Sequence, residues 1–454
     1  MPLLSRRHLL AAPAFLRARS GTAADRPNVL WIIGDDLGVE LSCYGRRDIS
    51  TPNMDRLAAG GVRFQNCHTT SPVCSSSRSA FNVGLYQTTT GTHHHRSHRG
   101  DGHRLPAGAR LITDRLREAG YFTCNVGEFA PGAKGTGKTD FNFVAERPFD
   151  GTHWNRRQKG QPFFAQVNFQ DPHKGPAFVE ARKQKVLVDP KRVELPPYYP
   201  DHPVVRDEVA NYLDAVQLVD RKAGLLLDAL RRDGALDNTV VFLFGDNGRC
   251  LLRGKQWLYE AGSHIPLLVS WPGVTRAGAT RPDVCTALDV TATTLAAAGI
   301  RQPEGFHGQP LFGAGAAPRE WIVTARDRCG EAIDRIRSVR DRRYRYIRNF
   351  MPERPYTQPS DYIARQYPTL GVLTNLHAAG KLDAVQSLFM VPRKPDVEFY
   401  DLQQDPHEVR NLAASRAHAG LMRQFAARLD QWMKETHDRG AIPETRDEYE
   451  KYRG

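Results

Sequence analysis

Two hydrophobic patterns alternate along the chain before about residue 315. Short, largely apolar runs that read as buried strands lie at residues 29–33, 121–126, 163–169, 240–244 and 267–270, and the first of them is apolar without interruption. Between them, segments with apolar residues three to four positions apart read as helices, the clearest being residues 111–119 and 205–232. Strands that alternate with helices predict an α/β fold, with a doubly wound, mostly parallel sheet flanked by helices.

The pattern changes after about residue 315. The stretches RIRSVRDRRYRYIRNF (335–350) and VEFYDLQQDPHEVRNLA (397–413) alternate charged and apolar residues as antiparallel strands do, and residues 416–436 read as a closing helix. We therefore predict an α/β domain at residues 25–315, which carries the candidate site. A smaller C-terminal α+β domain with an antiparallel sheet is expected at residues 316–454.

The N-terminus, residues 1–24, has the layout of a twin-arginine export signal. Arg6 and Arg7 precede a short apolar run at residues 9–16, and small residues follow at 21–24. A disordered basic leader is the alternative interpretation. No later segment reaches the roughly 18 apolar residues that a membrane span needs. We therefore expect a soluble protein that is exported to the periplasm or the extracellular space.

Composition changes this picture little. The 63 Lys and Arg residues exceed the 50 Asp and Glu residues. This balance suits an anionic partner, but the excess is spread along the chain, which favours an ordinary solvated surface. We expect no nucleic-acid partner. The seven cysteines include no C-x-x-C pair, which argues against a zinc ribbon or a thioredoxin-like site.

Polar residues follow four of the expected strands at the point where each strand ends. They are Asp35 and Asp36, Glu128, Asp171 and His173, and Asp246 and Asn247. Active sites of doubly wound sheets lie beyond the carboxyl ends of the strands, so we expect these side chains to converge. Asp35, Asp36 and Asp246, with the amide oxygen of Asn247, offer the hard oxygen ligands that Ca²⁺ or Mg²⁺ prefers.

Residues 132–139, GAKGTGKT, match the phosphate-binding pattern G-x-x-x-x-G-K-[ST]. Such a loop needs a helix that begins at its lysine, so that helix N–H groups face the phosphates. The residues that follow, DFNFVAERPFDG, are rich in aromatic residues, contain Pro148 and Gly151, and form helices poorly. We therefore interpret the segment as a glycine-rich loop that carries lysines, and not as a nucleotide site.

Cys74 lies in the stretch TTSPVCSSSRSAFNVG, where a helix is expected to begin directly after it. This places Cys74 at the positive end of a helix, with Arg78 one turn further on. Both features stabilise an anion or an anionic transition state. These residues alone leave a buried core cysteine and a reactive cysteine as equal alternatives.

Five motifs occur in the order and roughly the spacing found in one enzyme family. They are RPNVLWIIGDDLG, TPNMDRLAAGGVRFQNCHTTSPVCSSSR, FQDPH, GDNG and GKQWLYEAG. Together they resemble the type I sulfatases of the alkaline-phosphatase-like superfamily, over most of the chain. The C-terminal FYDLQQDPHEVRNLA and LDQWMKETHD look most like the heparan N-sulfatase (sulfamidase) branch and its bacterial relatives.

The resemblance implies a role for each matching residue. Cys74 would be oxidised to formylglycine by a formylglycine-generating enzyme, and one hydroxyl of the hydrated aldehyde would attack sulfur while the other helps to expel sulfate. Arg78 would steady the nucleophile, and His173 and Lys255 would contact the sulfate and assist the leaving group. One Ca²⁺ ion would polarise the sulfate oxygens. Its implied ligands are Asp35, Asp36, residue 74, Asp246 and Asn247.

The sequence departs from the family pattern at three places. Ser76 stands where proline is usual, two residues after the cysteine. The usual G-K-x-H is absent, so Lys138, or less favourably Lys134, is expected to supply the lysine charge. A histidine could come from His93, His94 or His95, which we also expect to contact substrate rather than a metal. His264 occupies the position of an arginine that is common in relatives, and it is a further candidate for substrate contact.

The resemblance predicts an enzyme that hydrolyses sulfate esters or N-sulfate groups of a sugar or polysaccharide. N-sulfoglucosamine of a heparan-like chain is one candidate substrate. A phosphodiesterase or phosphonate hydrolase of the same superfamily is the alternative activity. A non-catalytic glycan-binding homologue, in which Ser76 prevents oxidation of Cys74, is the alternative from a different class. The sugar, the disulfides and the oligomeric state stay open.

Overall fold

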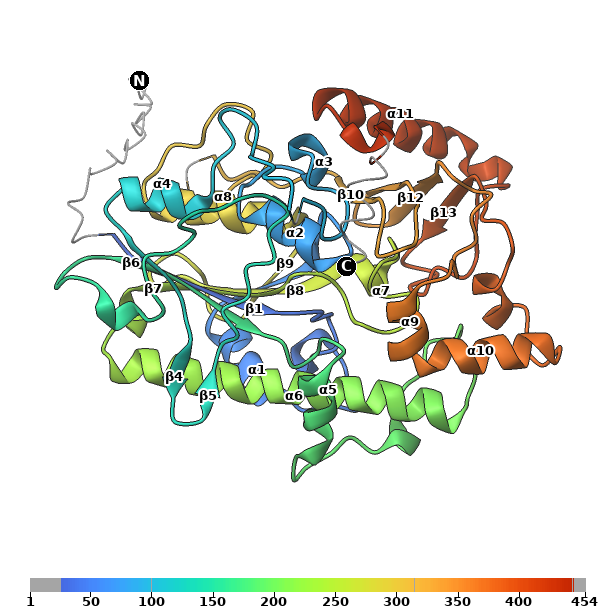
Figure 1. Cartoon of the computed structure of the whole chain (residues 1–454), viewed down its shortest axis with the longest axis horizontal. Coiled ribbons are helices and arrows are strands. Elements are labelled where there is room, and N and C mark those ends of the chain that lie inside the picture. Colours follow the sequence, from blue (N-terminus) through green and yellow to red (C-terminus); the bar gives the residue numbers. More distant parts are fainter. Residues whose placement is uncertain (1–25, 99, 314, 443, 445–454) are drawn as a thin grey trace, which may run out of the picture.

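A seven-stranded sheet runs through the larger part of the molecule (Figure 1). The structure is a computed structural model, and it describes residues 26–98, 100–313, 315–442 and 444. The expected export signal at 1–24 lies outside these residues. The strand order is β3 (Phe122–Asn125), β6 (Phe163–Phe169), β1 (Asn28–Gly34), β7 (Thr239–Gly245), β8 (His264–Ser270), β2 (Val62–His68) and β9 (Ala279–Thr286). All strands run in one direction except β8, which confirms the mostly parallel α/β sheet.

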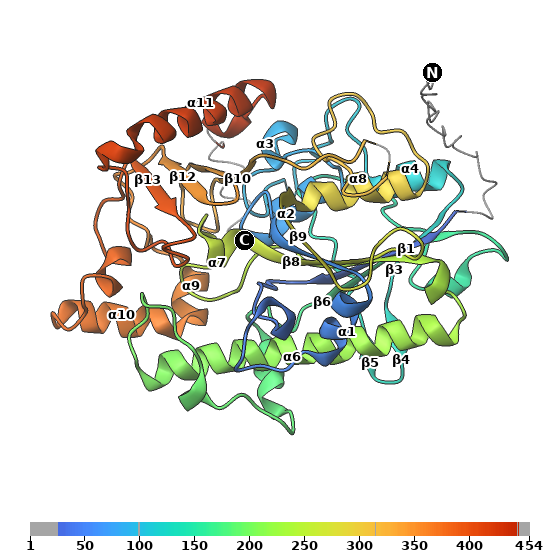
Figure 2. The ribbon, with the colours of Figure 1, turned by 180° about the vertical axis from the view of Figure 1, so that it is seen from behind.

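Helices cover both faces of this sheet, as Figures 1 and 2 show from opposite sides. On one face lie α1 (Pro52–Gly60) and the long helix α6 (Pro203–Arg232). On the other face lie α2 (Cys74–Phe81), α4 (Ile112–Glu118) and α8 (Ala287–Ala297). This two-sided arrangement explains why the central strands are largely apolar, because every side chain of β1, β6 and β7 is buried.

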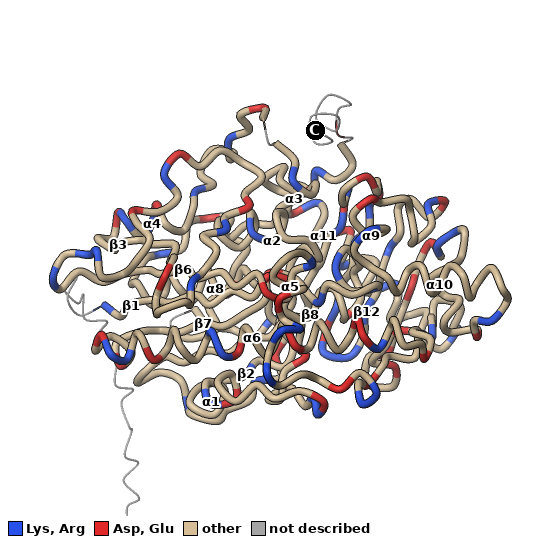
Figure 3. The backbone as a smooth tube through the Cα atoms, turned by 60° about the horizontal axis from the view of Figure 1, so that its bottom comes forward, with Lys and Arg blue, Asp and Glu red and all other residues tan. Residues whose placement is uncertain are grey.

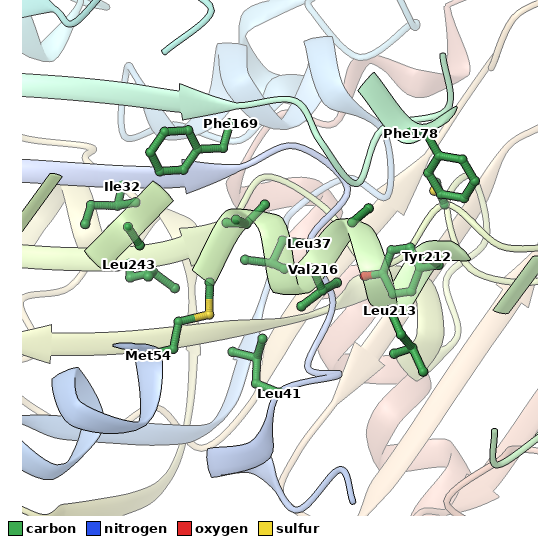
Figure 4. Close-up of a cluster of buried hydrophobic side chains, with 14 of the residues drawn as sticks. Ile32, Leu37, Leu41, Met54, Phe169, Phe178, Tyr212, Leu213, Val216 and Leu243 are labelled. Atoms are coloured by element: carbon green, nitrogen blue, oxygen red, sulfur yellow. The ribbon is translucent and has the colours of Figure 1, made fainter. Parts of the chain in front are cut away.

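Helix α6 shows how the sequence pattern determines the packing. Its buried residues Val205, Val209, Tyr212 and Val216 follow at spacings of three and four and form one stripe along the helix. The helix begins at Pro203, and the His202 ring accepts a hydrogen bond from the backbone N–H of residue 204 at 3.2 Å. Figure 4 shows Tyr212 and Val216 of this stripe among apolar side chains from the sheet and from α1. Full burial of a valine side chain stabilises the folded state by roughly 1.5–3 kcal/mol.

A second, antiparallel sheet follows in the C-terminal part of the chain. Its order is β10 (Ile322–Arg326), β11 (Ile336–Arg340), β12 (Tyr344–Asn349) and β13 (Val397–Asp401), and α11 (Ala419–Glu435) packs on it. The predicted antiparallel sheet and closing helix are therefore confirmed. The domain boundary at residue 315 stays a prediction.

Smaller elements complete the described part of the chain. They are α3 (Gln87–Thr90), the β4 (Glu128–Ala130) and β5 (Ala133–Lys134) hairpin, α5 (Pro176–Glu180), α7 (Glu260–Ser263), α9 (Asp361–Gln366) and α10 (Pro368–Ala378). Figure 3 shows Lys and Arg interspersed with Asp and Glu along the backbone, as the dispersed charges of the sequence suggested. Among the described helices, none has the length and apolar character needed to cross a membrane. All seven cysteines have free thiols.

Candidate active site

Three carboxylates meet at the carboxyl ends of β1 and β7. These neighbouring strands are parallel and pair Gly34 with Gly245, so the residues that follow each strand emerge side by side. Oxygen atoms of Asp35, Asp36 and Asp246 all lie within 4.8 Å of one another, and all three side chains are buried. The structure thus brings together the acids that the sequence placed at two strand ends.

The backbone around Asp36 is held in an unusual conformation. Asp36 has a φ of 62°, in the left-handed region that few residues other than glycine adopt. Its N–H donates to Asp246 Oδ1 at 2.8 Å, and the Tyr212 hydroxyl donates to its carbonyl at 3.1 Å. A side chain at Gly245 would place its Cβ 2.1 Å from the carbonyl oxygen of Leu37, so glycine is required there. These contacts fix the two acidic turns against each other.

Cys74 is the first residue of α2 and lies directly beside the acids. Its Sγ is 3.7 Å from Asp36 Oδ1, and the side chain is buried. Burial raises the pKa of this thiol well above its usual range, although the charges of Lys138 and Lys255 oppose the shift. The thiol is therefore protonated at neutral pH, and an unmodified Cys74 is a poor nucleophile.

Three cationic side chains face the three carboxylates. Arg78, also in α2, donates from Nε to Asp246 Oδ2 at 2.8 Å, and its Nη2 is 3.8 Å from Asp35 Oδ1. Lys138 Nζ is 2.7 Å from Asp35 Oδ2. Lys255 Nζ is 2.9 Å from Asp36. The positive and negative charges of these six side chains balance.

Burial and the neighbouring charges together shift the pKa values of Asp35 and Asp246 in opposite directions. Burial raises the pKa of Asp35, but the charges of Lys138, His173 and Arg78 outweigh it and hold this pKa well below the usual range. Burial raises the pKa of Asp246 to about 7, against the opposing charge of Arg78 and with the help of the other two acids. A cation bound among the carboxylates would lower the pKa of Asp246 again.

Lys138 reaches the acids from the glycine-rich loop. The β4–β5 hairpin precedes it, and the segment after it is irregular as far as a short turn at Trp154–Arg156. Because no helix begins at Lys138, the backbone N–H groups of this loop do not form the phosphate-binding site of a helix N-terminus. The expectation that residues 132–139 are not a nucleotide site agrees with this geometry. Lys134, the other lysine of the loop, is exposed on β5.

His173 lies close to Cys74 and Asp35. One ring nitrogen of His173, Cys74 Sγ and an Asp35 oxygen lie within 4.8 Å of one another. His173 Nδ1 is 2.8 Å from the carbonyl oxygen of Lys174, so Nδ1 carries the proton of the neutral ring. Burial lowers the pKa of His173, and the charge of Lys255 adds to this effect. The other nitrogen, Nε2, is then the one available for proton transfer.

Two of the acids expected at the strand ends lie elsewhere. Glu128 is exposed on the β4–β5 hairpin, because β3 ends earlier, at Asn125. Asp171 pairs with Lys222 of α6 at 2.6 Å. Neither carboxylate belongs to the acidic cluster, and the convergence of all four strand ends was a wrong prediction in this respect.

The predicted substrate histidines separate into two places. His93, His94 and His95 lie in the loop after α3, and the His95 backbone N–H donates to the carbonyl of Arg328 at 2.9 Å. His264 stacks on His68 with ring centroids 4.8 Å apart, and its Nδ1 is 3.3 Å from Glu260. The contacts of His264 are thus with the β2–β8 region and not with the acidic cluster. Its role in substrate binding stays a prediction.

Two further residues at the site carried no clear sequence signal. Asn168 Oδ1, at the end of β6, accepts from Arg78 Nη1 at 2.6 Å. Tyr362 of α9 lies over Lys255, with Nζ 5.7 Å from the ring centroid, and its ring centroid is 6.3 Å from that of His173. The signal that could have found Asn168 is its polar side chain in a largely apolar strand, which it shares with Gln166. Nothing local marks Tyr362, because it comes from the C-terminal part of the chain.

The serines after Cys74 hold the histidine loop. Ser76 Oγ donates to the carbonyl oxygen of His93 at 3.0 Å. Ser75 Oγ accepts from the backbone N–H of Arg96 at 2.7 Å. The residue that replaces the usual proline, Ser76, therefore anchors the loop next to Cys74.

The acidic cluster fits a hard divalent cation. Asp35 Oδ1 and Asn247 Oδ1 are buried and have no hydrogen-bond partner. Buried oxygen atoms of this kind are costly unless something satisfies them. The donor set is three carboxylates and one amide oxygen, which is typical of a Ca²⁺ or Mg²⁺ site and not of a zinc site.

Comparisons with known proteins give the family. The family model "Sulfatase" matches residues 27–150 and 146–300, and the model "N-sulphoglucosamine sulphohydrolase, C-terminal" matches residues 251–356. An ulvan-active sulfatase of Formosa agariphila is 30% identical over 93% of this chain and 77% of its own length. The human N-sulphoglucosamine sulphohydrolase is 28% identical over 92% of each chain. The chain therefore belongs to the sulfatase family, which hydrolyses sulfate from its substrates.

Solved structures share the fold. One, determined in complex with its substrate D-glucosamine-2-N,6-O-disulfate, superposes with a TM-score of 0.64 at 18% identity, over 91% of this chain and 98% of its own. A phosphonate monoester hydrolase of Agrobacterium radiobacter superposes with a TM-score of 0.66 at 17% identity, over 90% of this chain and 96% of its own. At such identities the likeness establishes the architecture alone, which both kinds of hydrolase share.

Proposed function

We propose that the protein is a Ca²⁺- and formylglycine-dependent sulfatase of a sulfated glycan. The observation that carries this proposal is the position of Cys74 at the start of α2, beside three buried carboxylates and three cationic side chains. The relatives that are named sulfatases support the reaction class.

The charge balance of the site supports a metal-assisted reaction on an anion. When all three carboxylates are ionised and no metal ion is bound, their charges and those of the three cations neutralise one another. A bound Ca²⁺ would be held by Asp35, Asp36, Asp246 and Asn247, and it would supply positive charge that polarises the sulfate oxygens. The site would then carry a net positive charge, which attracts a sulfate monoester or an N-sulfate.

The protonated state of the Cys74 thiol supports its conversion to another group. A thiol whose pKa burial has raised does not attack sulfur efficiently, whereas formylglycine at this position would supply an oxygen nucleophile through its hydrate. Residue 74 would remain at the positive end of α2, where developing negative charge is stabilised.

The surrounding side chains would position the sulfate and move one proton. Arg78 orients residue 74 and Asp246 through its buried guanidinium. The ammonium groups of Lys138 and Lys255 bind sulfate oxygens. His173 donates a proton from Nε2 to the leaving oxygen or nitrogen, because a neighbouring sulfate anion raises the pKa of its ring and favours the protonated form.

We propose N-sulfoglucosamine, or a sulfate ester on a related amino sugar, as the substrate class. The match of the C-terminal family model and the human relative support this choice. The ulvan-active relative supports a different sulfated polysaccharide as a competing substrate. The twin-arginine layout of residues 1–24 supports export of the enzyme, and the proposal requires a formylglycine-generating enzyme as its maturation partner.

Release of inorganic sulfate from a panel of substrates tests the proposal. The panel contains N-sulfoglucosamine, 6-O-sulfoglucosamine, an ulvan oligosaccharide, an aryl sulfate and an aryl phosphonate monoester. We expect sulfate release from at least one sulfated sugar, with N-sulfoglucosamine preferred, and no release by the Cys74→Ala variant. Faster turnover of the phosphonate than of every sulfate would favour the alternative hydrolase, and inactivity of fully oxidised protein on the whole panel would favour a glycan-binding homologue.

A further inference from the structure

A cavity is lined by residues of the loop that carries the histidines. It has a volume of about 190 Å³, and its walls include His93, His94, His98, His103, Arg439 and Glu444. The loop that carries His93 is hydrogen-bonded to Ser75 and Ser76, the two residues that follow Cys74. The cavity therefore adjoins the catalytic centre without being part of it.

The ring of His93 has no hydrogen-bond partner of its own. His93 is 6% exposed, and neither of its ring nitrogens has a partner in the described part of the chain. A buried, unsatisfied imidazole is costly, so a ligand in the cavity that reached a ring nitrogen of His93 would offset this cost. The ring lies 4.3 Å from that of His94, centroid to centroid, so one ligand can contact both.

Arg439 supplies positive charge at the edge of the same cavity. Its side chain is exposed, and no hydrogen bond or ion pair of its guanidinium is found among the described residues. A Cβ at Gly91 would lie 3.0 Å from Arg439 Nη1 and 3.6 Å from His103, so glycine leaves room for the guanidinium here. The one carboxylate of the lining, Glu444, is neutralised by its ion pair with Arg328.

We propose that this cavity is a second binding site in which His93, His94 and Arg439 hold an anionic group of the glycan. The group is a carboxylate or a second sulfate, on a part of the substrate other than the sulfate that is removed. The proposal rests on the proposed function, because a sulfated polysaccharide carries several anionic groups along one chain. A guanidinium and imidazole N–H groups are the donors that such oxygen anions prefer.

The arrangement of the four histidines argues against a metal site. His98 and His103 stack with centroids 3.9 Å apart, but their Nε2 atoms lie beside the backbone carbonyls of Gly91 and Thr90. Among the described residues, the groups with converging ligand atoms include none of these histidines. The rings therefore form the wall of a pocket and not a coordination sphere.

The variant Arg439→Gln tests the proposal, with Arg423→Gln, an exposed arginine of α11, as the matched control. Kinetics are measured on a disaccharide of N-sulfoglucosamine and a uronic acid, and on an aryl sulfate that has no second anionic group. We expect Arg439→Gln to raise KM for the disaccharide about tenfold or more, the cost of one hydrogen bond to a charged group. The kcat/KM for the aryl sulfate should stay within twofold, and the control should change neither. Equal losses on both substrates, or none on either, would refute the second site.

A binding measurement separates this proposal from the proposed function. Calorimetry with the full-length Cys74→Ala protein and the same disaccharide should give a Kd about tenfold weaker when Arg439→Gln or His93→Gln is added. If the oxidised parent enzyme releases sulfate from no substrate, the proposed function fails, while the calorimetry still decides whether the cavity binds the anion. Binding of Zn²⁺ that His93→Gln removes, together with an unchanged disaccharide Kd, would show a metal site and overturn the proposal.

Discussion

Replacing Lys138 with methionine removes the ammonium group that lies 2.7 Å from Asp35 Oδ2. Methionine keeps the length and the apolar stem of the side chain, so the change isolates the charge. Lys138 is largely buried, with 14% of its side chain exposed, and solvent screens it little. The neighbouring Lys134→Met is the matched control, because Lys134 belongs to the same loop and is exposed.

The expected loss follows from the position of this charge. Two unit charges about 4 Å apart attract by about 4 kcal/mol at an effective dielectric constant of about 20. Removing one preorganised group that stabilises charge in a transition state lowers kcat by about 10²–10³-fold. We therefore expect a fall in kcat of this size for Lys138→Met. The free energy of unfolding should fall by only about 1–3 kcal/mol, because Arg78 still lies 3.8 Å from Asp35.

Two assays check this prediction on the same protein preparations. Initial rates of sulfate release give kcat and KM, and urea unfolding followed by tryptophan fluorescence gives the free energy of unfolding. Lys134→Met should match the parent protein in both. If Lys138→Met keeps kcat within threefold of the parent, or if Lys134→Met shows the larger loss, then Lys138 does not replace the lysine of the missing G-K-x-H pattern.

Three further predictions concern the metal, the histidine loop and pH. Chelation with EDTA should lower Tm by roughly 3 °C relative to protein in Ca²⁺ at about 100 Kd. Asn247→Ala should abolish this difference, and an unchanged shift would argue against these ligands. Ser76→Ala removes the hydrogen bond to the His93 carbonyl, so it should lower the free energy of unfolding in urea by about 1 kcal/mol. It should also lower kcat/KM for the glycan more than for an aryl sulfate, and an equal loss of kcat/KM on both substrates would exclude an anchoring role. Burial lowers the pKa of His307 from 6.5 to about 4. The free energy of unfolding therefore contains a contribution from the neutral ring that is fully present above pH 6.5 and is lost as the pH falls toward 4. The loss of stability between pH 7 and pH 5 should therefore be about 2 kcal/mol smaller in His307→Gln, and identical pH profiles would refute this.

The central architecture could be predicted because its signals are local. Strands β1, β6 and β7 are buried on both faces, so each is largely apolar in sequence. Strands β2 and β9 were missed, because exposed and buried positions alternate irregularly along them. Register shifts also interrupt their pairing with each other. Strands whose burial depends on tertiary neighbours leave a weak pattern in the sequence.

The site could be predicted in part, for the same reason. Asp35, Asp36 and Asp246 follow clear strands, and the parallel pairing of those strands brings them together. Glu128 was misplaced because the sequence does not show that β3 ends at Asn125 and that the chain then turns into a hairpin. The contact of Tyr362 with Lys255 joins distant parts of the chain, which no local pattern encodes.

The oxidation state of residue 74 tests the central claim most directly. Preparations made with increasing amounts of a formylglycine-generating enzyme would be compared by mass spectrometry of the Cys74 peptide and by sulfate release. The account predicts that the rate of sulfate release rises in proportion to the fraction of aldehyde and falls to zero for the unmodified thiol. Sulfate release by protein with an intact Cys74 thiol, or none by fully oxidised protein, would contradict it.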